Sequence, residues 1–179
     1  MHVRRFVFTL GLAFGCLTSG CVSELDPDAP RAVDGADESL AGQDGLRATY
    51  FRNVDLTGEA LTRVDAIVDF DWGRNAPAAG LPVDGFSARW EGFYLARETG
   101  PHRFAVRSDD GVRLFVGDDP EPLVENWRNQ AATTVRGTID LVAGELYSLR
   151  IEYFDARGAA LMELRCAPPS LPAGANEPI

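Results

Sequence analysis

Apolar and polar residues alternate with a period of two through the middle of the chain, as expected of β-strands that bury one face. Residues 145–154 show this most clearly. One face of this segment carries an unbroken apolar and aromatic series: Tyr147, Leu149, Ile151 and Tyr153. The opposite face carries Leu146, Ser148, Arg150 and Glu152. The alternation predicts a strand whose second face is turned mostly toward solvent.

The same alternation recurs at regular intervals. Further strands are predicted at residues 47–51, 66–70, 86–95, 101–108, 112–116, 137–141 and 162–166. Gly, Asp, Asn and Pro separate these runs, and such residues favour turns. No segment has the apolar spacing of an amphipathic helix of three turns. About eight or nine short strands predict an all-β fold, an antiparallel β-sandwich or barrel, as a single domain at residues 45–168.

The first twenty residues read as an export signal. Arg4 and Arg5 precede an apolar run at residues 6–17, too short to span a bilayer core of ~30 Å. The sequence that ends at Cys21, Leu-Thr-Ser-Gly-Cys, resembles the cleavage box of bacterial lipoproteins. It implies a lipidated Cys21, hence a membrane partner through the lipid anchor. Ordinary cleavage with plain secretion is one alternative, and twin-arginine export is another.

The segments on either side of the predicted domain have a different composition. Residues 21–44 combine seven Asp and Glu residues with one Arg and few large apolar residues, which predicts a flexible acidic linker. Residues 169–179 are rich in proline and are predicted to be a disordered tail. Val22 follows Cys21 without the acidic residue of an inner-membrane retention signal. The expected location is therefore the cell envelope, after secretion across the inner membrane, as an outer-membrane lipoprotein.

Charge and cysteine content narrow the possible functions. The net charge is -10, and no basic stripe suited to phosphates occurs, so nucleic acid is not an expected partner. The three cysteines and two histidines are dispersed, which argues against zinc, haem or iron–sulfur sites. Cys166 lies on the apolar face of the last predicted strand and is expected to be a buried thiol.

Several short motifs occur in a familiar order. They are Gly45 to Phe51, Ile67 to Gly73, Phe86 to Gly92, Ser108 to Leu114, Glu125 to Trp127 and Leu149 to Tyr153. Taken together, they resemble the protective-antigen β-sandwich domain, which occurs in anthrax protective antigen, yeast flocculins and bacterial glycosidases. The resemblance covers nearly the whole folded segment.

The resemblance implies a calcium site. In sugar-binding members, two adjacent aspartates joined by a cis peptide coordinate calcium, and they match Asp109 and Asp110. A later loop adds a side-chain oxygen and backbone carbonyls. The matching positions are Asp155 for the side chain and Arg157 and Ala159 for the carbonyls. Asp155 stands where the flocculin pattern has Asn.

Elementary chemistry is consistent with this assignment. Ca²⁺ takes six to eight hard oxygen ligands, and adjacent carboxylates repel one another unless a cation neutralises them. The third carboxylate, Asp155, should increase the attraction for calcium. The sequence Asp109-Asp110-Gly111 is, however, also an ordinary turn signal, because Asp accepts local backbone hydrogen bonds and Gly tolerates positive φ.

The expected function is surface-anchored carbohydrate binding, with adhesion to a glycan or cell-envelope polysaccharide through Asp109, Asp110, Asp155 and Arg157. Ala159 replaces a tryptophan of the flocculin loop, so this loop offers no aromatic platform for a sugar. The alternative is a structural or protein-interaction module that binds neither sugar nor calcium. No nucleophile with a base, phosphate loop or cofactor motif occurs, so no catalytic residues are predicted and the chain is not expected to be an enzyme.

The remaining conspicuous residues are interpreted structurally. Asp118 and Asp119 belong to an acidic stretch predicted to form a solvated hairpin loop. Trp72, Trp90 and Trp127 are expected to be core or core-edge anchors.

Overall fold

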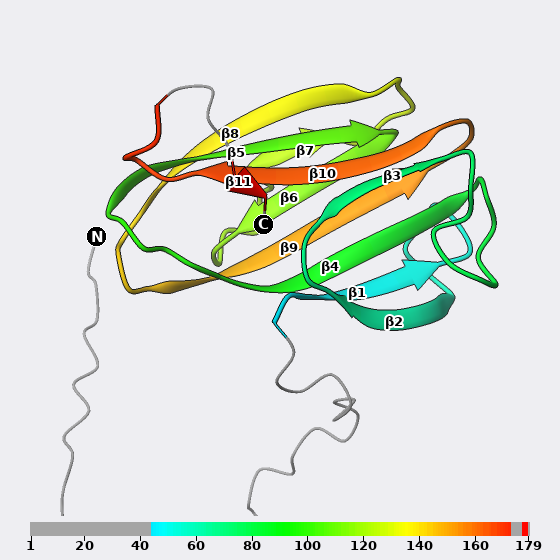
Figure 1. Cartoon of the computed structure of the whole chain (residues 1–179), viewed down its shortest axis with the longest axis horizontal. Coiled ribbons are helices and arrows are strands. Elements are labelled where there is room, and N and C mark those ends of the chain that lie inside the picture. Colours follow the sequence, from blue (N-terminus) through cyan, green and yellow to red (C-terminus); the bar gives the residue numbers. More distant parts are fainter. Residues whose placement is uncertain (1–43, 173–176, 179) are drawn as a thin grey trace, which may run out of the picture. The chain divides into compact units, whose positions relative to one another are not determined.

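The computed structural model describes residues 44–172 and 177–178, which form two antiparallel sheets packed face to face (Figure 1). The strands are β1 (Leu46–Phe51), β2 (Glu59–Asp65), β3 (Asp69–Gly73), β4 (Phe86–Leu95), β5 (Gly100–Asp109), β6 (Gly111–Val116), β7 (Val124–Asn126), β8 (Thr133–Leu141), β9 (Leu146–Asp155), β10 (Ala160–Ala167) and β11 (Glu177–Pro178). The predicted all-β sandwich is confirmed. Nowhere in this part of the chain is there a helix long and apolar enough to cross a membrane.

The strand order brings distant parts of the chain together. One sheet has the order β2-β1-β4-β9-β6-β7, and the other has β11-β10-β5-β8, with β3 also paired to β10. The longest ladder joins β4 to β9 over ten residue pairs, from Phe86 opposite Asp155 to Leu95 opposite Leu146. β1, at the start of the domain, is hydrogen-bonded to both β2 and β4.

The core lies between the sheets and is built from the predicted apolar faces. Its largest fully buried side chains are Trp90, Tyr50, Tyr153, Phe86, Phe104, Leu114, Leu141, Leu149, Ile151, Met162, Leu164 and His102. Aromatic rings meet there edge to face or stacked: Trp72 stacks on Phe70 with centroids 5.0 Å apart. Trp90 is therefore a core residue, and the half-buried Trp72 packs at the core edge, as predicted.

The outer face of β9 departs from the simple alternation. Glu152 points away from the core, yet it is only 7% exposed. Three arginines on β4, β6 and β9 surround its carboxylate at 3.5 to 3.8 Å: Arg89, Arg113 and Arg150. Their long side chains cover Glu152, so a carboxylate that the sequence places toward solvent is buried by its ion pairs.

Some strands differ in extent from the predictions. The strand predicted at 66–70 is β3, which begins at Asp69, and β8 begins at Thr133 rather than at 137. β2 and β7 were not predicted. β2 lies at a sheet edge with most of its residues half-buried, and β7 has three residues, so neither carries a strong alternating pattern.

The C-terminal segment needs a correction. Residues 169–179 were predicted to be a disordered tail, but Ser170 donates hydrogen bonds to Glu98 from its backbone N–H and its hydroxyl. Arg103 donates to the Leu171 carbonyl, and β11 pairs with Arg165 and Cys166 of β10. Side chains on the β4–β5 connection and on β5 therefore provide hydrogen-bond partners for this segment, whose prolines lack a backbone N–H.

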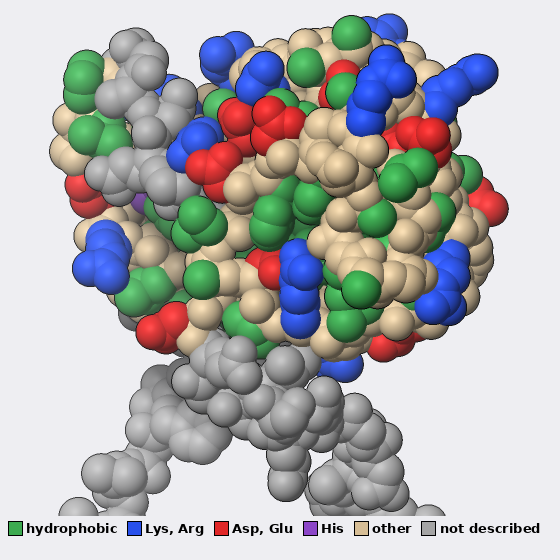
Figure 2. Space-filling model, turned by 45° about the vertical axis from the view of Figure 1, so that its right-hand side comes forward, with side chains coloured by type: hydrophobic (Ala, Val, Ile, Leu, Met, Phe, Trp, Pro, Cys, Tyr) green, Lys and Arg blue, Asp and Glu red, His purple; other side chains and the backbone are tan. Residues whose placement is uncertain are grey.

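On the face shown in Figure 2, basic side chains are scattered among apolar ones, and a small group of acidic side chains lies at the upper left. The residues before Asp44, including Cys16, Cys21 and the predicted signal and linker, lie outside the described residues.

Candidate functional site

The residues assigned to calcium come together at one end of the sandwich, toward the right in Figure 1, where β5 and β9 end and β4, β6 and β10 begin. Asp109 is the last residue of β5, and Asp155 is the last residue of β9. β9 lies next to β6, with Phe154 opposite Gly111, and this register places Asp155 beside the turn that contains Asp110.

The turn between β5 and β6 holds the two adjacent aspartates. The peptide bond between Asp109 and Asp110 is cis, as the resemblance implies. Asp110 is 5% exposed, and its two carboxylate oxygens accept backbone N–H groups from different loops, Gln130 at 2.7 Å and Ala156 at 2.9 Å. Asp109 Oδ2 accepts the Ala132 N–H at 3.0 Å. Each oxygen keeps lone pairs with which it can still bind a cation.

Asp155 is the most unusual group of the site. Its side chain is fully buried, and neither carboxylate oxygen has a hydrogen-bond partner of normal geometry. Burial, followed by the negative charges of Asp110, Asp84 and Asp109, raises the pKa of Asp155 to about 7, against a smaller opposing effect of the Gly85 amide. A buried carboxylate without donors is costly, and a cation is one group that offsets this cost.

Asp109 and Tyr153, two further titratable groups of the site, also have raised pKa values. Burial and the charge of Asp110 raise the pKa of Asp109, while its bond from the Ala132 amide lowers it. The pKa of Tyr153 is also raised, first by burial and then by the charges of the nearby aspartates. The Tyr153 hydroxyl donates to the Asp109 carbonyl. Acidic charge therefore accumulates at this end of the sandwich with no basic side chain among the causes of these shifts.

Asp84 is a fourth acid that the sequence analysis missed. It lies in the connection between β3 and β4, and its Oδ1 accepts the Gly158 N–H at 2.8 Å across 74 residues of sequence. Asp84 thereby holds the loop between β9 and β10. The Asp84-Gly85 pair directly precedes the strand predicted at 86–95, and this turn signal was the one available hint.

The loop residues Arg157 and Ala159 lie between β9 and β10 and are exposed. Their assignment as carbonyl ligands stays a prediction. Within residues 44–172 and 177–178, no three His, Cys, Asp or Glu side chains lie close enough to share one metal ion. The aspartates are thus electrostatic neighbours with free oxygens, and calcium would have to draw them closer together.

Gly111 completes the turn and is required for its packing. A Cβ at this position would lie 2.1 Å from Cε1 of Phe154, whose ring packs edge to face on Trp127. We expect Gly111→Ala to lower the free energy of unfolding by about 1–3 kcal/mol, because the ring has little room to retreat. Urea denaturation measures the loss. Gly144→Ala is the comparison: no atom lies within 4 Å of its added Cβ, but at φ 87° the alanine is strained, so it gives the cost of backbone strain without a clash, and a smaller effect at Gly111 would contradict a steric cause.

The remaining candidates have structural environments. Asp118 and Asp119 are exposed in the β6–β7 connection, as predicted. Trp127 packs against Phe154, and Arg113 lies 4.3 Å above the Trp127 ring centroid. Cys166 is a buried thiol, as predicted, with its Sγ 3.4 Å from the Tyr94 hydroxyl.

Comparison with known proteins identifies the family of the chain. Residues 42–170 match the family model described as PA14 domain. The chain is 37% identical over 120 residues to the anti-sigma-I factor RsgI3 of Acetivibrio thermocellus, a match that covers 67% of this chain and 18% of that protein. The chain therefore spans less than a fifth of that relative's length.

Solved structures show the same fold. An anti-sigma factor domain-containing protein from Clostridium clariflavum superposes with a TM-score of 0.69 at 34% identity, covering 76% of this chain and 45% of that one. The PA14 sugar-binding domain from an RTX adhesin superposes with a TM-score of 0.59 at 19% identity, covering 76% and 94%. The second likeness concerns the fold alone.

Proposed function

Because this chain belongs to the PA14 domain family, we propose that it is a carbohydrate-binding module, not an enzyme, whose glycan site is organised by calcium on Asp109, Asp110 and Asp155. The observation that carries the proposal is Asp155, a fully buried carboxylate with both oxygens unpartnered beside two further aspartates. Sugar binding by a domain of the same fold supports it.

The chain's own residues have distinct parts in this proposal. The amides of Gln130, Ala132 and Ala156 hold the carboxylates of Asp109 and Asp110 in place without neutralising them. Asp155 supplies oxygens that no protein donor occupies. Calcium would neutralise this charge, and two sugar hydroxyls could complete its coordination shell. Arg157, exposed beside the site, is available to bind the rest of the glycan.

The proposed location is the cell envelope, through lipidation of Cys21, with an envelope polysaccharide as the partner. The competing proposal is a structural or protein-interaction module that keeps the fold without the site. The described loop between β9 and β10 favours this alternative in one respect, because Ala159 offers no ring for a sugar face.

Calcium titration separates the two. We expect calcium at a hundredfold excess over Kd to stabilise the full chain by about 2.7 kcal/mol, seen as a raised Tm. The double variant D109A/D110A should lose this rise, whereas D118A/D119A, a matched pair of adjacent exposed acids, should keep it. An unchanged Tm at millimolar calcium would rule out the calcium site, and a glycan array run with calcium and with chelator then tests the sugar.

A further inference from the structure

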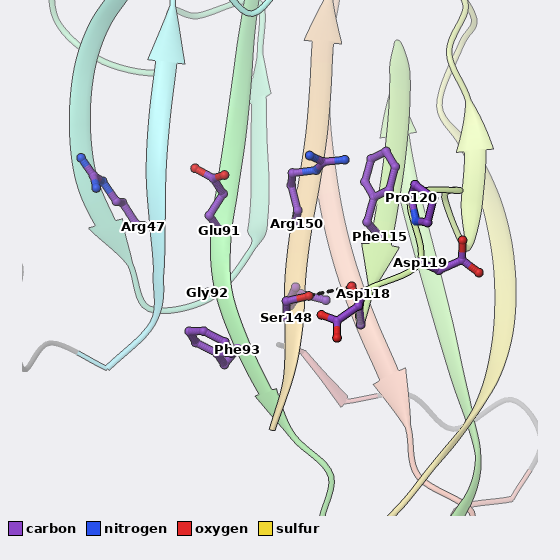
Figure 3. A pocket seen from close by; sticks show the side chains of 12 residues that line it. Arg47, Glu91, Gly92, Phe93, Phe115, Asp118, Asp119, Pro120, Ser148 and Arg150 are labelled. Carbon is purple, nitrogen blue, oxygen red and sulfur yellow. Dashed lines mark hydrogen bonds between the residues drawn. The ribbon is translucent and has the colours of Figure 1, made fainter. Parts of the chain in front are cut away.

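The outer face of the six-stranded sheet carries an open groove of about 660 Å³, away from the carboxylate end (Figure 3). One row of side chains crosses it on four adjacent strands. The ladders place Arg47 opposite Glu91, Glu91 opposite Arg150 and Arg150 opposite Phe115. At strand spacings near 4.8 Å the row is about 14 Å long. Phe93 and Asp118 flank it, as Figure 3 shows.

The polar groups of this row are largely uncommitted, unlike those of the next row along the same strands. In that next row Arg89, Glu152, Arg113 and Glu125 are joined by ion pairs of 3.0 to 3.7 Å. In the groove, the side chains of Arg47, Glu91 and Asp118 make no hydrogen bond or ion pair with any residue that the structure describes, whereas Arg150 lies 3.8 Å from the Glu152 carboxylate. The charged groups of Arg47, Glu91 and Asp118 are therefore available to form hydrogen bonds with a ligand.

The two aromatic residues of the groove differ in their availability. Arg150 lies 3.9 Å above the Phe115 ring centroid and covers it, so Phe115 is 9% exposed and serves to hold the guanidinium in place. Phe93 is 70% exposed, the most exposed of the large apolar side chains. An open ring on a rigid strand, bordered by carboxylates and guanidinium groups, is a platform for a flat ligand with an apolar face and polar edges.

We propose that this groove is a second glycan-binding site, which takes a neutral polysaccharide chain without calcium. The apolar face of one sugar stacks on Phe93, while Glu91 and Asp118 accept hydrogen bonds from sugar hydroxyls and Arg47 donates to hydroxyl oxygens. A neutral ligand fits the mixed charge of the lining, in which Glu91, Asp118 and Asp119 would repel the phosphates of a lipid surface. The proposal does not depend on the calcium site, because Arg150 lies five residues, or about 17 Å, before Asp155 along β9.

Affinity electrophoresis of the full chain in EDTA tests this inference. The probes are arabinoxylan, hydroxyethylcellulose and galactomannan, each cast into a native gel. We expect at least one of them to retard the chain, and F93S to weaken that retardation at least tenfold. I67S is the matched control, since Ile67 is also an exposed apolar residue, at 48%, and does not line the groove; it should migrate like the unmodified chain.

Further variants and a second ligand test which class of ligand binds and whether a loss of binding reflects a loss of folding. E91Q should weaken retardation without changing the Tm, because the Glu91 side chain makes no hydrogen bond or ion pair with the described residues. Because EDTA removes calcium, retardation in this gel cannot come from the calcium site, which separates failure of the groove from failure of that site. No retardation by any probe, or equal retardation of F93S, overturns the proposal. Binding to phosphatidylglycerol vesicles that F93S abolishes, without polysaccharide retardation, assigns the groove to membrane docking instead.

Discussion

Replacing Asp65 by alanine is expected to lower the free energy of unfolding by about 3–5 kcal/mol. The substitution removes a buried carboxylate that accepts hydrogen bonds from three donors. Asp65 is 7% exposed. Its carboxylate accepts the Tyr50 hydroxyl at 2.8 Å, Trp90 Nε1–H at 2.9 Å and Arg63 Nε–H at 2.6 Å. Tyr50 and Trp90 are fully buried, so their polar groups would remain without water or protein acceptors.

Urea denaturation of D65A checks this value, and E125A is its control. Glu125 is also paired with an arginine, Arg113 at 3.0 Å, but its side chain is 53% exposed. An exposed pair contributes about 0–1 kcal/mol, so E125A should unfold nearly like the unmodified chain. A loss below 1 kcal/mol in D65A would show that water can replace the carboxylate as the acceptor for Tyr50 and Trp90.

The variant D155N is expected to stabilise the calcium-free protein at pH 8 and to weaken calcium binding. The pKa of Asp155 is about 7 when folded, against an ordinary value of 3.8. Between these two values the unfolded chain releases the proton while the folded chain retains it, so stability falls as pH rises through this interval. Above pH 7 the folded protein bears the full free-energy cost of a buried, ionised Asp155. D155N removes it, a gain of about 2–4 kcal/mol at roughly 1.4 kcal/mol per unit.

Chemical denaturation from pH 5 to pH 8 without calcium measures this effect. The unmodified chain should lose stability as the pH rises, whereas D155N should not. D140N, which changes an exposed acid on β8, should lose stability like the unmodified chain. Calcium titration of D155N should then show a weaker site, because one negative charge is gone. If D155N is no more stable than the unmodified chain at pH 8, water or a protein group satisfies Asp155 in solution.

The sequence predicts what depends on short-range pattern. Alternation locates the strands that bury Leu149, Ile151 and Tyr153, and it identifies the β-sandwich. The motif order places Asp109, Asp110 and Asp155 at strand ends, and the structure brings those ends together. The strand predictions succeed because each depends on a period or a turn within about ten residues, and the assignment of the three aspartates to calcium stays a prediction.

Features that depend on distant partners could not be read from the sequence. Asp84 joins the site through Gly158, and Glu152 is buried by arginines from two other strands as well as its own. The C-terminal segment is held by Glu98 and Arg103, far from it in sequence. The groove around Phe93 likewise requires the register of four strands. Local composition carries none of this information, because the partners are chosen by the pairing of the sheets.

The placement of β1 has a mechanical consequence. β1 runs from Leu46 toward the carboxylate end at Phe51, and it is hydrogen-bonded on both sides, to β2 and to β4. If the chain is held upstream of residue 45 and a ligand pulls at Asp109 and Asp155, tension runs along β1. The hydrogen bonds of both ladders lie across that direction, so they are sheared together and cannot be unzipped one at a time. Under that geometry, β1 is arranged to resist a force applied along its length.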